Sequence, residues 1–339
     1  MTSEGYYIVK KGSPEHAFEL RSFEIASLSG SDVLIEVEAF GLNYADVMAR
    51  KGLYREAPPF PCIVGYEVVG KIISVGSETD KELEGKRVLA FTRFGGYAKH
   101  VITQSDACAI VGDEPIGDLL ALCTQGVTAY YMAMYLAPVR KGDKVLIHAA
   151  AGGVGSLLIQ MVNLQGGEAI AKVSSTAKVD RAKELGAKYA VNYKTHDYAK
   201  WLSDTIGKID VSYNPVGGST FKKDMGLMNS GGRMFIFGGS ELGDGKWGVL
   251  SALNFVRKMG VVIPVGLMMS SRNILGVNML KIADNKPEVL KMCLQGVIEL
   301  YQSGKLSIPK ATQYDHTDLN EAHRLLESGK SMGKIAIKW

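Results

Sequence analysis

A glycine-rich segment in the middle of the chain has the residue types and spacing that bind a dinucleotide. Residues 145–160 read VLIHAAAGGVGSLLIQ, which predicts a buried strand over Lys144–Ile147, a tight turn and a helix from Gly153. The spacing Ala150-x-Gly152-x-x-Gly155 is a variant of the dinucleotide fingerprint, with Ala in place of the first Gly. Such a turn lets a phosphate approach free backbone N–H groups at the positive end of a helix dipole. Because short glycine patterns recur by chance, a turn that binds nothing is the alternative.

The elements around this turn alternate as they do in a nucleotide-binding sheet. After Cys123, strand patterns and helix patterns follow one another along the chain. Strict alternation implies a doubly wound parallel sheet of Rossmann type, with the dinucleotide at the carboxyl ends of its strands. The predicted strands are 144–147, 168–173, 189–192, 209–213 and 233–237, and the predicted helices are 153–165, 178–185, 198–205 and 221–228.

The two ends of the chain have a different pattern of predicted secondary structure. Residues 1–124 form a β-rich unit of short strands separated by glycines and prolines, at 32–39, 68–75, 87–90 and 98–102. The tail, 280–339, contains two predicted helices (288–301 and 319–327) and a closing strand, 334–338. It has too little apolar material for a domain of its own, so we expect it to fold back onto the N-terminal unit. The predicted domains are therefore 1–124 continued by 280–339, with 125–279 inserted between them.

Length and composition limit the class of protein. A chain of 339 residues, 46% apolar and 22% charged, is expected to form two ordinary globular domains. A net charge of +4 without a basic tract argues against a nucleic-acid partner. Four widely separated cysteines indicate buried thiols in a reducing, cytoplasmic environment. We expect no signal peptide, because Met1–Lys11 lacks a long apolar stretch, and no membrane insertion, because the uncharged run Val145–Val162 is interrupted by glycines.

Several separated segments together resemble a known family. Residues 39–46 (AFGLNYAD), 61–70 (PCIVGYEVVG) and 148–155 (HAAAGGVG) resemble the zinc-free quinone oxidoreductase branch of the medium-chain dehydrogenase/reductase superfamily. The stretch from Val191 to Gly218 and residues 271–279 (SRNILGVNM) resemble vesicle amine transport protein-like members of that branch. The resemblance implies an α/β fold, with a Rossmann domain inserted into a β-rich, partly open barrel of GroES-like type that forms the catalytic domain.

The resemblance also predicts that no metal is bound. Relatives with catalytic zinc carry a Cys where this chain has Asn43 and a His where it has Tyr66. Zinc needs three ligands of Cys, His or carboxylate type, and Asn and Tyr are poor substitutes. Cys123 lies near the region of the third ligand but out of register, as a buried thiol would. Without a Lewis acid, the site is better suited to reducing an electron-poor quinone or α,β-unsaturated carbonyl than to oxidising an alcohol.

The end of the second predicted strand favours NADPH over NADH. NAD-selective sites place an acid there, about 20 residues after the glycine turn. Here the strand 168–173 is followed by Ser174-Ser-Thr-Ala-Lys178, which offers hydroxyls and a cation to a 2′-phosphate. The resemblance adds Lys178 and Tyr193 as contacts of the phosphate end, each with a structural role as the alternative. The predicted cofactor contacts are Thr128, Gly152, Gly153, Val154, Gly155, Ser174, Ser175, Lys178, Tyr193, Asn214 and Gly238.

Two of the segments near the cofactor are open to more than one interpretation. Asn214 departs from the acid common at this position in related reductases. It either contacts the nicotinamide ribose or builds the turn that ends its strand. The glycine-rich loop from Glu241 to Gly248 is either a mobile flap or a simple surface loop.

Three residues are predicted to serve the reacting acceptor. Asn43 has an amide N–H to donate to an acceptor oxygen or to the cofactor, although a structural turn role is the alternative. Tyr54 matches a pocket tyrosine of the branch and offers a phenol hydrogen bond. Tyr66 replaces the zinc-ligand histidine, and the alternative is that it fills the vacated space. His148 is expected to be a buried strand residue, and Asp46 and Glu67 are expected to be structural, paired to basic groups.

The predicted function is zinc-independent, NADPH-dependent reduction of a small quinone or enone, bound in a cleft between the two domains. The alternatives are a non-catalytic or regulatory NADPH-binding protein of the same fold and an enoyl-thioester reductase, because fold does not settle function. The resemblance also implies a homodimer in which residues 273–280 of two subunits pair edge to edge.

Overall fold

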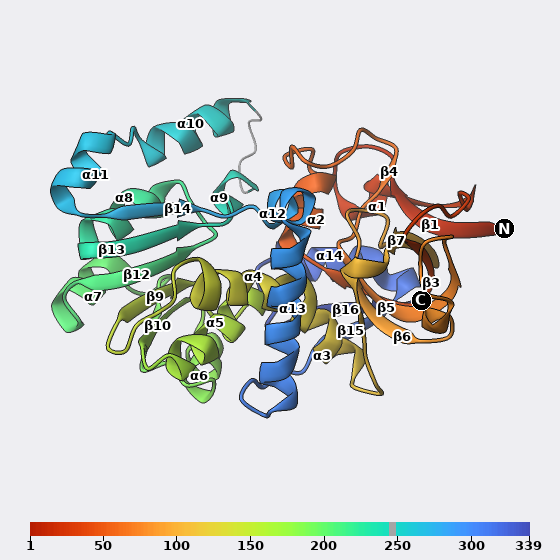
Figure 1. Ribbon diagram of the computed structural model, residues 1–339. Coiled ribbons are helices and arrows are strands. Elements are labelled where there is room, and N and C mark those ends of the chain that lie inside the picture. Colours follow the sequence, from red (N-terminus) through yellow and green to blue (C-terminus); the bar gives the residue numbers. More distant parts are fainter. Residues whose placement is uncertain (244–248) are drawn as a thin grey trace. The chain divides into compact units, whose positions relative to one another are not determined.

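The computed structural model describes residues 1–243 and 249–339 and divides them into two compact units (Figure 1). The first unit contains Met1–Val127, Leu280–Tyr301 and Ser307–Trp339. The second unit contains Thr128–Met279 and Gln302–Leu306. The sequence predicts boundaries at 124/125 and 279/280, and the tail, apart from Gln302–Leu306, belongs to the same unit as the N-terminal part.

The second unit is built on a six-stranded sheet in which every neighbouring pair of strands is parallel. Its order is β11-β10-β9-β12-β13-β14, which is the Rossmann order 3-2-1-4-5-6 counted from the first strand of the unit. The order reverses between β9 and β12, and the carboxyl ends of these two strands are where such sheets bind ligands. The strands are β9 (Lys144–His148), β10 (Glu168–Val173), β11 (Tyr189–Asn192), β12 (Ile209–Asn214), β13 (Met228–Ile236) and β14 (Asn273–Gly276).

Helices connect these strands and bury their apolar side chains against the sheet. Five side chains of α5 between Leu157 and Val162 are buried, and the helix contacts β9 and β10. Leu202 of α7 and Phe221 of α8 pack in a second cluster with Leu146 and Ile170 from the sheet. The helices are α5 (Gly153–Leu164), α6 (Thr176–Glu184), α7 (Tyr198–Thr205), α8 (Ser219–Leu227), α9 (Ser240–Gly243), α10 (Val249–Met259) and α11 (Pro264–Ser270), besides α4 (Val127–Tyr130) at the start of the unit.

The first unit is mostly antiparallel β-structure. A seven-stranded sheet runs β15-β16-β3-β5-β6-β8, with β7 pairing β3, and a three-stranded sheet runs β2-β1-β4. From the tail, β16 pairs antiparallel with β3, so the C-terminal segment completes the sheet. The strands are β1 (Thr2–Ile8), β2 (Phe18–Glu24), β3 (Asp32–Leu42), β4 (Cys62–Ile63), β5 (Glu67–Val75), β6 (Arg87–Phe91), β7 (His100–Gln104), β8 (Cys108–Ile110), β15 (Thr312–Asp315) and β16 (Ile335–Lys338). Together with the parallel sheet of the second unit, this sheet confirms the predicted α/β fold with a GroES-like unit.

The first unit also contains helices, some of which carry residues of the candidate site. They are α1 (Pro14–Ala17), α2 (Tyr44–Arg50), α3 (Ile116–Leu120), α12 (Met279–Asn285), α13 (Pro287–Gln302) and α14 (Leu319–Glu327). After α3 the chain continues as a π-helical segment, Ala121–Gly126, in which Cys123 has a non-helical ψ of −110°. Such π-helical turns are frequent at functional sites.

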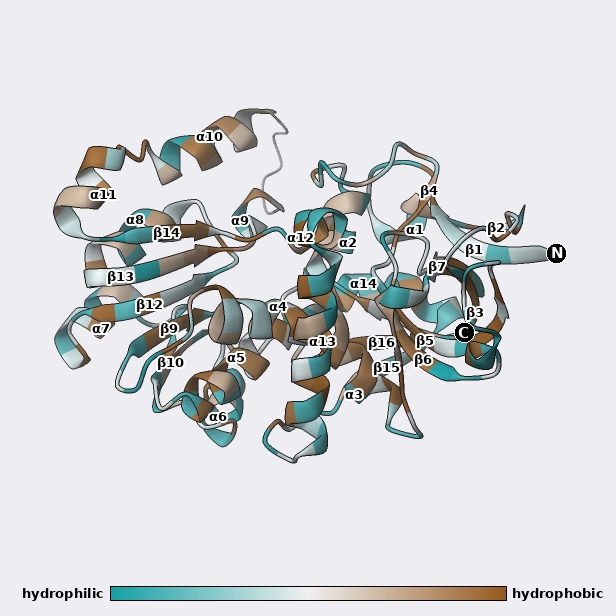
Figure 2. Ribbon diagram, in the orientation of Figure 1, coloured by the Kyte–Doolittle hydropathy of each residue, from teal (hydrophilic) through white to brown (hydrophobic). Residues whose placement is uncertain are grey.

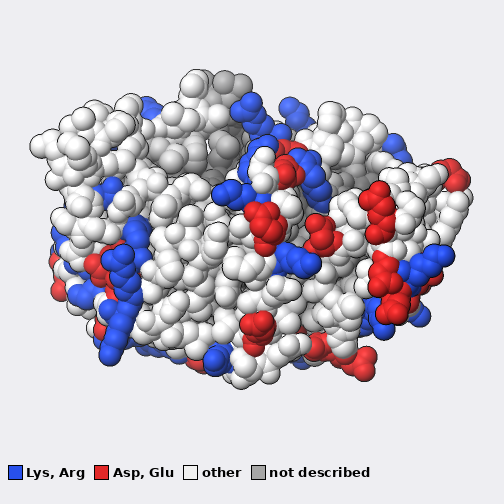
Figure 3. Space-filling model, viewed as in Figure 1, with Lys and Arg blue, Asp and Glu red and all other residues white. Residues whose placement is uncertain are grey.

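Two helical stretches are long and apolar enough to cross a membrane by length and composition. Ile116–Leu136 is 72% buried and so is a core segment of the protein. Ser251–Ser270, which covers most of α10 and all of α11, is not buried, and the ribbon of these two helices includes hydrophobic, brown stretches in Figure 2. Charged side chains of both signs lie on the face shown in Figure 3, in groups separated by uncharged surface.

Candidate active site and cofactor site

The turn after β9 has the backbone geometry of a dinucleotide-binding loop. Ala149 has a positive φ of 49°, which is uncommon for a residue with a side chain, and Gly152 caps α5. A Cβ on Gly155 would lie 2.5 Å from the carbonyl oxygen of Ala149 and 2.6 Å from Cα of Ala150. Only glycine permits this approach of helix and strand, which is the role of the third glycine of the fingerprint. The residues present therefore fit the pyrophosphate of a dinucleotide.

Lys178 of α6, the helix after β10, and Lys194, which follows β11, are close enough for their charges to interact. Ser175 caps α6, with its Oγ accepting the backbone N–H of Lys178 at 3.4 Å. Lys178 is half-buried, and burial together with the charge of Lys194 lowers the pKa of its ammonium. Two cations so close favour an anion between or beside them. Tyr193, directly after β11, is 44% exposed. Contact of these residues with a cofactor stays a prediction.

Asn214 has the turn role that the sequence left open. Its side chain is fully buried, and its Oδ1 accepts the backbone N–H groups of Val216 and Gly217, each at 2.9 Å. Its Nδ2 donates to Oγ1 of Thr220 at 2.9 Å and to Oδ2 of Asp224 at 2.8 Å. The amide is therefore engaged within the chain, and a contact with the cofactor has no support from this side chain.

The remaining predicted cofactor residues lie in the same unit. Ser174 is half-buried at the end of β10, Gly153 and Val154 form the first turn of α5, Gly238 is exposed after β13, and Thr128 is buried in α4. Residues 244–248 of the loop from Glu241 to Gly248 lie outside the described residues, so neither interpretation of that loop is tested. The Glu241 carboxylate accepts from Ser219 and pairs with Lys258 at 2.6 Å.

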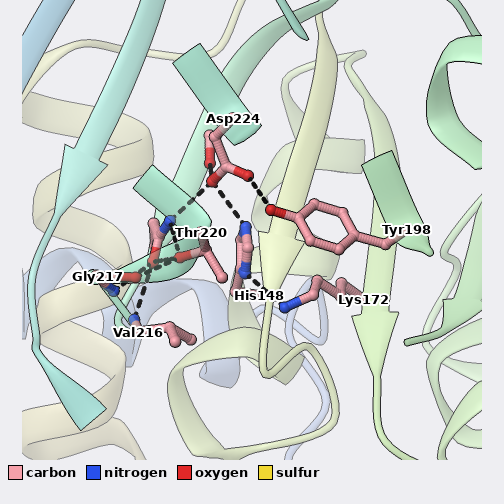
Figure 4. A network of polar contacts seen from close by, with 9 residues as sticks. His148, Lys172, Tyr198, Val216, Gly217, Thr220 and Asp224 are labelled. Carbon is pink, nitrogen blue, oxygen red and sulfur yellow. Dashed lines mark hydrogen bonds and ion pairs between the residues drawn. The ribbon is translucent and has the colours of Figure 1, made fainter. Parts of the chain in front are cut away.

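A buried polar network that the sequence did not predict lies behind the glycine turn (Figure 4). The carboxylate of Asp224 accepts from Nε2 of His148, from Oγ of Ser212 and from the hydroxyl of Tyr198, each at 2.8 Å. Burial alone would raise the pKa of Asp224, but His148 and these hydrogen bonds outweigh it and lower the pKa. Nζ of Lys172 lies 3.2 Å from Nδ1 of His148. One sequence signal marks this network, because Lys172 is the only charged residue within the strand segment 169–173.

In the first unit, Asn43 is held by a buried ion pair. Its Nδ2 donates to Oε1 of Glu67 at 2.8 Å, and its Oδ1 accepts from Nζ of Lys334 at 3.4 Å. Lys334 and Glu67 form a salt bridge in which both side chains are fully buried. Glu67 thus has the basic partner expected of it, whereas nothing in the sequence singled out Lys334. The catalytic role of Asn43 stays a prediction, and one of its amide hydrogens is not used by this pair.

The Lys334–Glu67 ion pair occupies space that is open only because residue 41 is a glycine. A Cβ on Gly41 would lie 2.2 Å from Oε1 of Glu67 and 2.7 Å from Nζ of Lys334. Any side chain at position 41 would displace the ion pair, so the Lys334–Glu67 pair depends on the glycine at this position.

Asp46 contributes a second buried carboxyl group to this region. Its Oδ2 accepts the backbone N–H of Asn43 at 2.7 Å, at the start of α2. Burial, which is only partly offset by this hydrogen bond, raises the pKa of Asp46 to about 7. Asp46 is therefore structural, as expected, but its contact is with the backbone rather than in a salt bridge with a basic group.

Tyr66 and Tyr54 lie together in the first unit, with their rings edge to face and 6.3 Å between centroids. The Tyr66 hydroxyl is buried and makes no hydrogen bond of good geometry within the described residues. It is nevertheless close enough to Tyr54 for the two phenols to affect each other's pKa. Burial raises the pKa of both phenols, so both stay protonated at neutral pH and are able to donate.

The donor set around Asn43 does not fit zinc. Burial and the nearby Glu67 raise the pKa of the Cys123 thiol well above its usual range, whereas zinc binds the thiolate. The ammonium of Lys334 already lies against Asn43 and Glu67, and it opposes a second cation. Within the residues that the structure describes, no group of three His, Cys, Asp or Glu residues is arranged to hold a metal.

Comparison with known proteins places this geometry in a family. Residues 29–139 match the alcohol dehydrogenase GroES-like domain, and residues 153–303 match the zinc-binding dehydrogenase family. A probable quinone oxidoreductase of Schizosaccharomyces pombe is 35% identical over 237 residues, which cover 69% of this chain and 71% of that protein. The synaptic vesicle membrane protein VAT-1 homolog of Danio rerio is 27% identical over 97% of this chain, which spans 66% of that longer protein.

A solved structure of similar fold is the Escherichia coli quinone oxidoreductase complexed with NADPH. It has a TM-score of 0.86 and 25% identity, and the match covers 100% of both chains. The fold and the site thus define an oxidoreductase of the medium-chain dehydrogenase/reductase superfamily. Within that superfamily, the chain belongs to the zinc-free quinone oxidoreductase branch.

Proposed function

We propose that this protein is a zinc-independent, NADPH-dependent reductase of quinones or α,β-unsaturated carbonyl compounds. The observation that carries the proposal is the buried Tyr66 hydroxyl beside Tyr54, which has no hydrogen-bond partner of good geometry among the described residues. A buried hydroxyl without a well-formed hydrogen bond costs about 1–3 kcal/mol, and the neighbouring Tyr54 phenol meets this need only in part, which favours a further partner that arrives with the substrate. The oxygen of a carbonyl or quinone is such a partner.

The chain's own residues would bind, orient and donate. When bound, NADPH supplies the hydride, and one proton must also reach the acceptor for the reduction to balance. The glycine turn before α5 holds the pyrophosphate, and Ser174, Ser175 and Lys178 bind the 2′-phosphate. Tyr66 donates a hydrogen bond to the acceptor oxygen, where negative charge develops, and Tyr54 orients that phenol. The proton itself comes from one of these phenols or from solvent.

A panel of acceptors tests the proposal directly. NADPH oxidation is followed by absorbance with a quinone, an enone and an enoyl thioester, for the wild type and for Tyr66→Phe, Tyr54→Phe and Asn43→Ala. An enone concentrates charge on one oxygen, so its reduction should fall by roughly a hundredfold when an oriented donor is lost. Quinone reduction should fall much less, because conjugation spreads the charge, and NADPH affinity should change less than either rate.

A matched control comes from the second unit. Tyr213 on β12 also has a buried hydroxyl without a partner among the described residues, so Tyr213→Phe removes the same atom elsewhere. This variant should keep wild-type rates. Full rates in all three site variants would mean that these residues are not catalytic. NADPH binding without turnover of any acceptor would instead support the non-catalytic alternative.

We further infer a two-fold dimer that covers the apolar edge of the second unit. β14 is an edge strand that pairs only with β13 among the described strands. On α10, α11 and the segment between them, Val261 is 90% exposed, Met268 73% and Met269 81%. Apolar surface of this extent marks an interaction site, and an uncovered edge strand invites aggregation.

Light scattering at micromolar concentration should therefore report a dimer. Met269→Lys places a charge in the proposed interface and should shift the protein toward monomer. Met332→Lys, at an exposed methionine of the first unit, is the matched control and should not. A wild-type monomer would contradict the inference. A cytoplasmic location also stays a proposal, supported by the free cysteines.

A further inference from the structure

The ammonium of Lys172 is buried at the carboxyl end of β10 without a direct carboxylate partner among the described residues. Its side chain is 6% exposed, and Nζ lies 4.5 Å from the ring centroids of both Tyr193 and Tyr198. Its hydrogen-bond partner is Nδ1 of His148 at 3.2 Å, as Figure 4 shows. Burying a cation in this way is costly, so an apolar residue would be the cheaper choice for a core strand.

The charge states of the neighbours fix the direction of the hydrogen bonds. Burial lowers the pKa of His148, so the ring is neutral, and its Nε2–H donates to the ionised Asp224. Nδ1 of His148 is then an acceptor, and Lys172 donates to it. A neutral imidazole thus separates the cation from the anion, and the chain Lys172–His148–Asp224 holds the ammonium in one position.

Tyr193 connects this buried cation to the surface. Tyr193 is 44% exposed, and its ring also lies over Nζ of the buried Lys172. Its backbone N–H donates to the carbonyl oxygen of Val173 at 3.0 Å, one residue before Ser174. Lys172 therefore supports the phosphate-binding end of the proposed cofactor site from the inside.

We propose that Lys172 is a positioning residue for the 2′-phosphate end of NADPH, acting through the Tyr193 ring and adding a shielded positive charge that favours NADPH over NADH. The proposal rests on the proposed function and extends it to a residue that would not touch the cofactor. The cation–π contact keeps Tyr193 in one orientation. The positive charge of Lys172 attracts the 2′-phosphate, and the buried surroundings of the lysine screen this attraction only weakly.

The position also makes cofactor binding depend on pH. Burial lowers the pKa of Lys172 to about 8, an effect increased by Lys223 and opposed by Asp224 and Glu241. Its surroundings comprise His148 of β9, Tyr193 after β11, Tyr198 of α7, Lys223 and Asp224 of α8 and Glu241 of α9. The pKa of His148 lies below its usual range and that of Tyr198 above, so neither changes charge near pH 8. NADPH affinity should therefore fall as the pH rises through this range.

Equilibrium titration of NADPH and NADH by fluorescence tests the proposal, with wild type, Lys172→Met, Lys172→Arg and Tyr193→Leu. Lys172→Met should weaken NADPH about tenfold and NADH much less. Lys172→Arg should restore affinity and remove the loss above pH 8, because a guanidinium stays charged there. Adding Lys172→Met to Tyr193→Leu should weaken NADPH less than Lys172→Met does in the wild type, because the effect through the ring is already lost and only the effect of the charge remains. Lys188→Met is the matched control, because Lys188 also lies over a tyrosine ring of this sheet, that of Tyr189 at 5.6 Å, but is paired with Glu168.

The outcomes separate this proposal from the proposed function. If the wild type binds neither cofactor, the proposed function fails. If it binds NADPH and Lys172→Met binds equally well, only the role of Lys172 is overturned. Loss of affinity above pH 8 that persists in Lys172→Arg would assign the titration to Lys178, whose pKa is also lowered, and would likewise overturn the proposal. The pH profile and the arginine variant keep the test decisive even if the methionine variant does not fold.

Discussion

Among the described residues, each unit buries one lysine beside its candidate site, and the two lysines have different partners. In the first unit, Lys334 is in direct contact with Glu67, and both side chains are fully buried. In the second unit, Lys172 reaches its anion, Asp224, only through the neutral ring of His148. Lys334 thus forms a direct ion pair, whereas Lys172 contacts a histidine and two aromatic rings.

The difference indicates two separate uses of buried charge. The Lys334–Glu67 pair holds both polar atoms of the Asn43 amide, so it fixes a neutral group in the candidate acceptor site. Lys172 has no carboxylate in direct contact, so its positive charge acts on the adjacent Tyr193 ring. This charge depends on pH, because burial lowers the pKa of Lys172 to about 8. A fixed scaffold suits the residue that must orient a substrate, and a titratable cation suits the binding of a phosphate.

Breaking each lysine's contacts should therefore have unequal effects on stability. Lys334→Met leaves the buried carboxylate of Glu67 without a cation, and loss of one partner of a buried pair costs about 3–5 kcal/mol. Lys172→Met leaves Asp224 with all of its hydrogen-bond donors, so its cost should be about 1 kcal/mol, near that of an average substitution. Denaturant unfolding at pH 7 measures both free energies.

The double variant Lys334→Met with Glu67→Leu sharpens this test. It removes both charges, and it should be less destabilised than Lys334→Met alone, because no unpaired ion stays buried. Equal costs for Lys334→Met and Lys172→Met would show that the two networks do not differ as described.

The buried carboxyl group of Asp46 should make the stability of the folded chain depend on pH. Its folded pKa, about 7, lies above that of an unfolded aspartate, so the folded chain binds the extra proton between about pH 4 and 7. Stability should therefore fall as the pH rises through this window. Asp46→Asn keeps an oxygen acceptor for the backbone N–H of Asn43 and cannot ionise, so its unfolding free energy should stay flatter and exceed that of the wild type above pH 7, by about 1–2 kcal/mol. A wild-type curve that rises across this window, parallel to that of Asp46→Asn, would show that Asp46 is ionised in the folded chain.

The alternating half of the fold was predictable because its signals are local. The bounds of β10, β11 and α7 agree with those expected from the sequence, α5 ends one residue earlier than expected, and β13 begins at Met228 rather than at Arg233. β1 and β2 were not expected, because they are partly exposed and lack a clear alternation of apolar and polar residues. No helix was expected over Ile116–Leu136 either, where a largely buried apolar segment shows no one-sided helical pattern.

Contacts within the candidate site were even harder to predict from local sequence patterns than the helices and strands. Asn43, Tyr54 and Tyr66 were chosen through the family resemblance, and the structure shows what surrounds them. Lys334 reaches Glu67 across 267 positions of sequence, so no local pattern could reveal the pair. Lys172 carried a signal that could have been used, since a lone charge in an apolar strand needs a buried partner. Asn214 could be interpreted in two ways from the sequence, and the structure shows the turn role, in which its Oδ1 accepts two backbone N–H groups.

The account depends most on the identity of the cofactor, which one titration tests directly. NADPH and NADH are each titrated into the wild type and Lys178→Ala, and binding is followed by fluorescence. NADPH should bind the wild type more tightly than NADH does. Lys178→Ala should weaken NADPH by roughly 1.5–3 kcal/mol, the range for a charged hydrogen bond, and barely change NADH. Equal affinity of the wild type for the two cofactors would contradict the account.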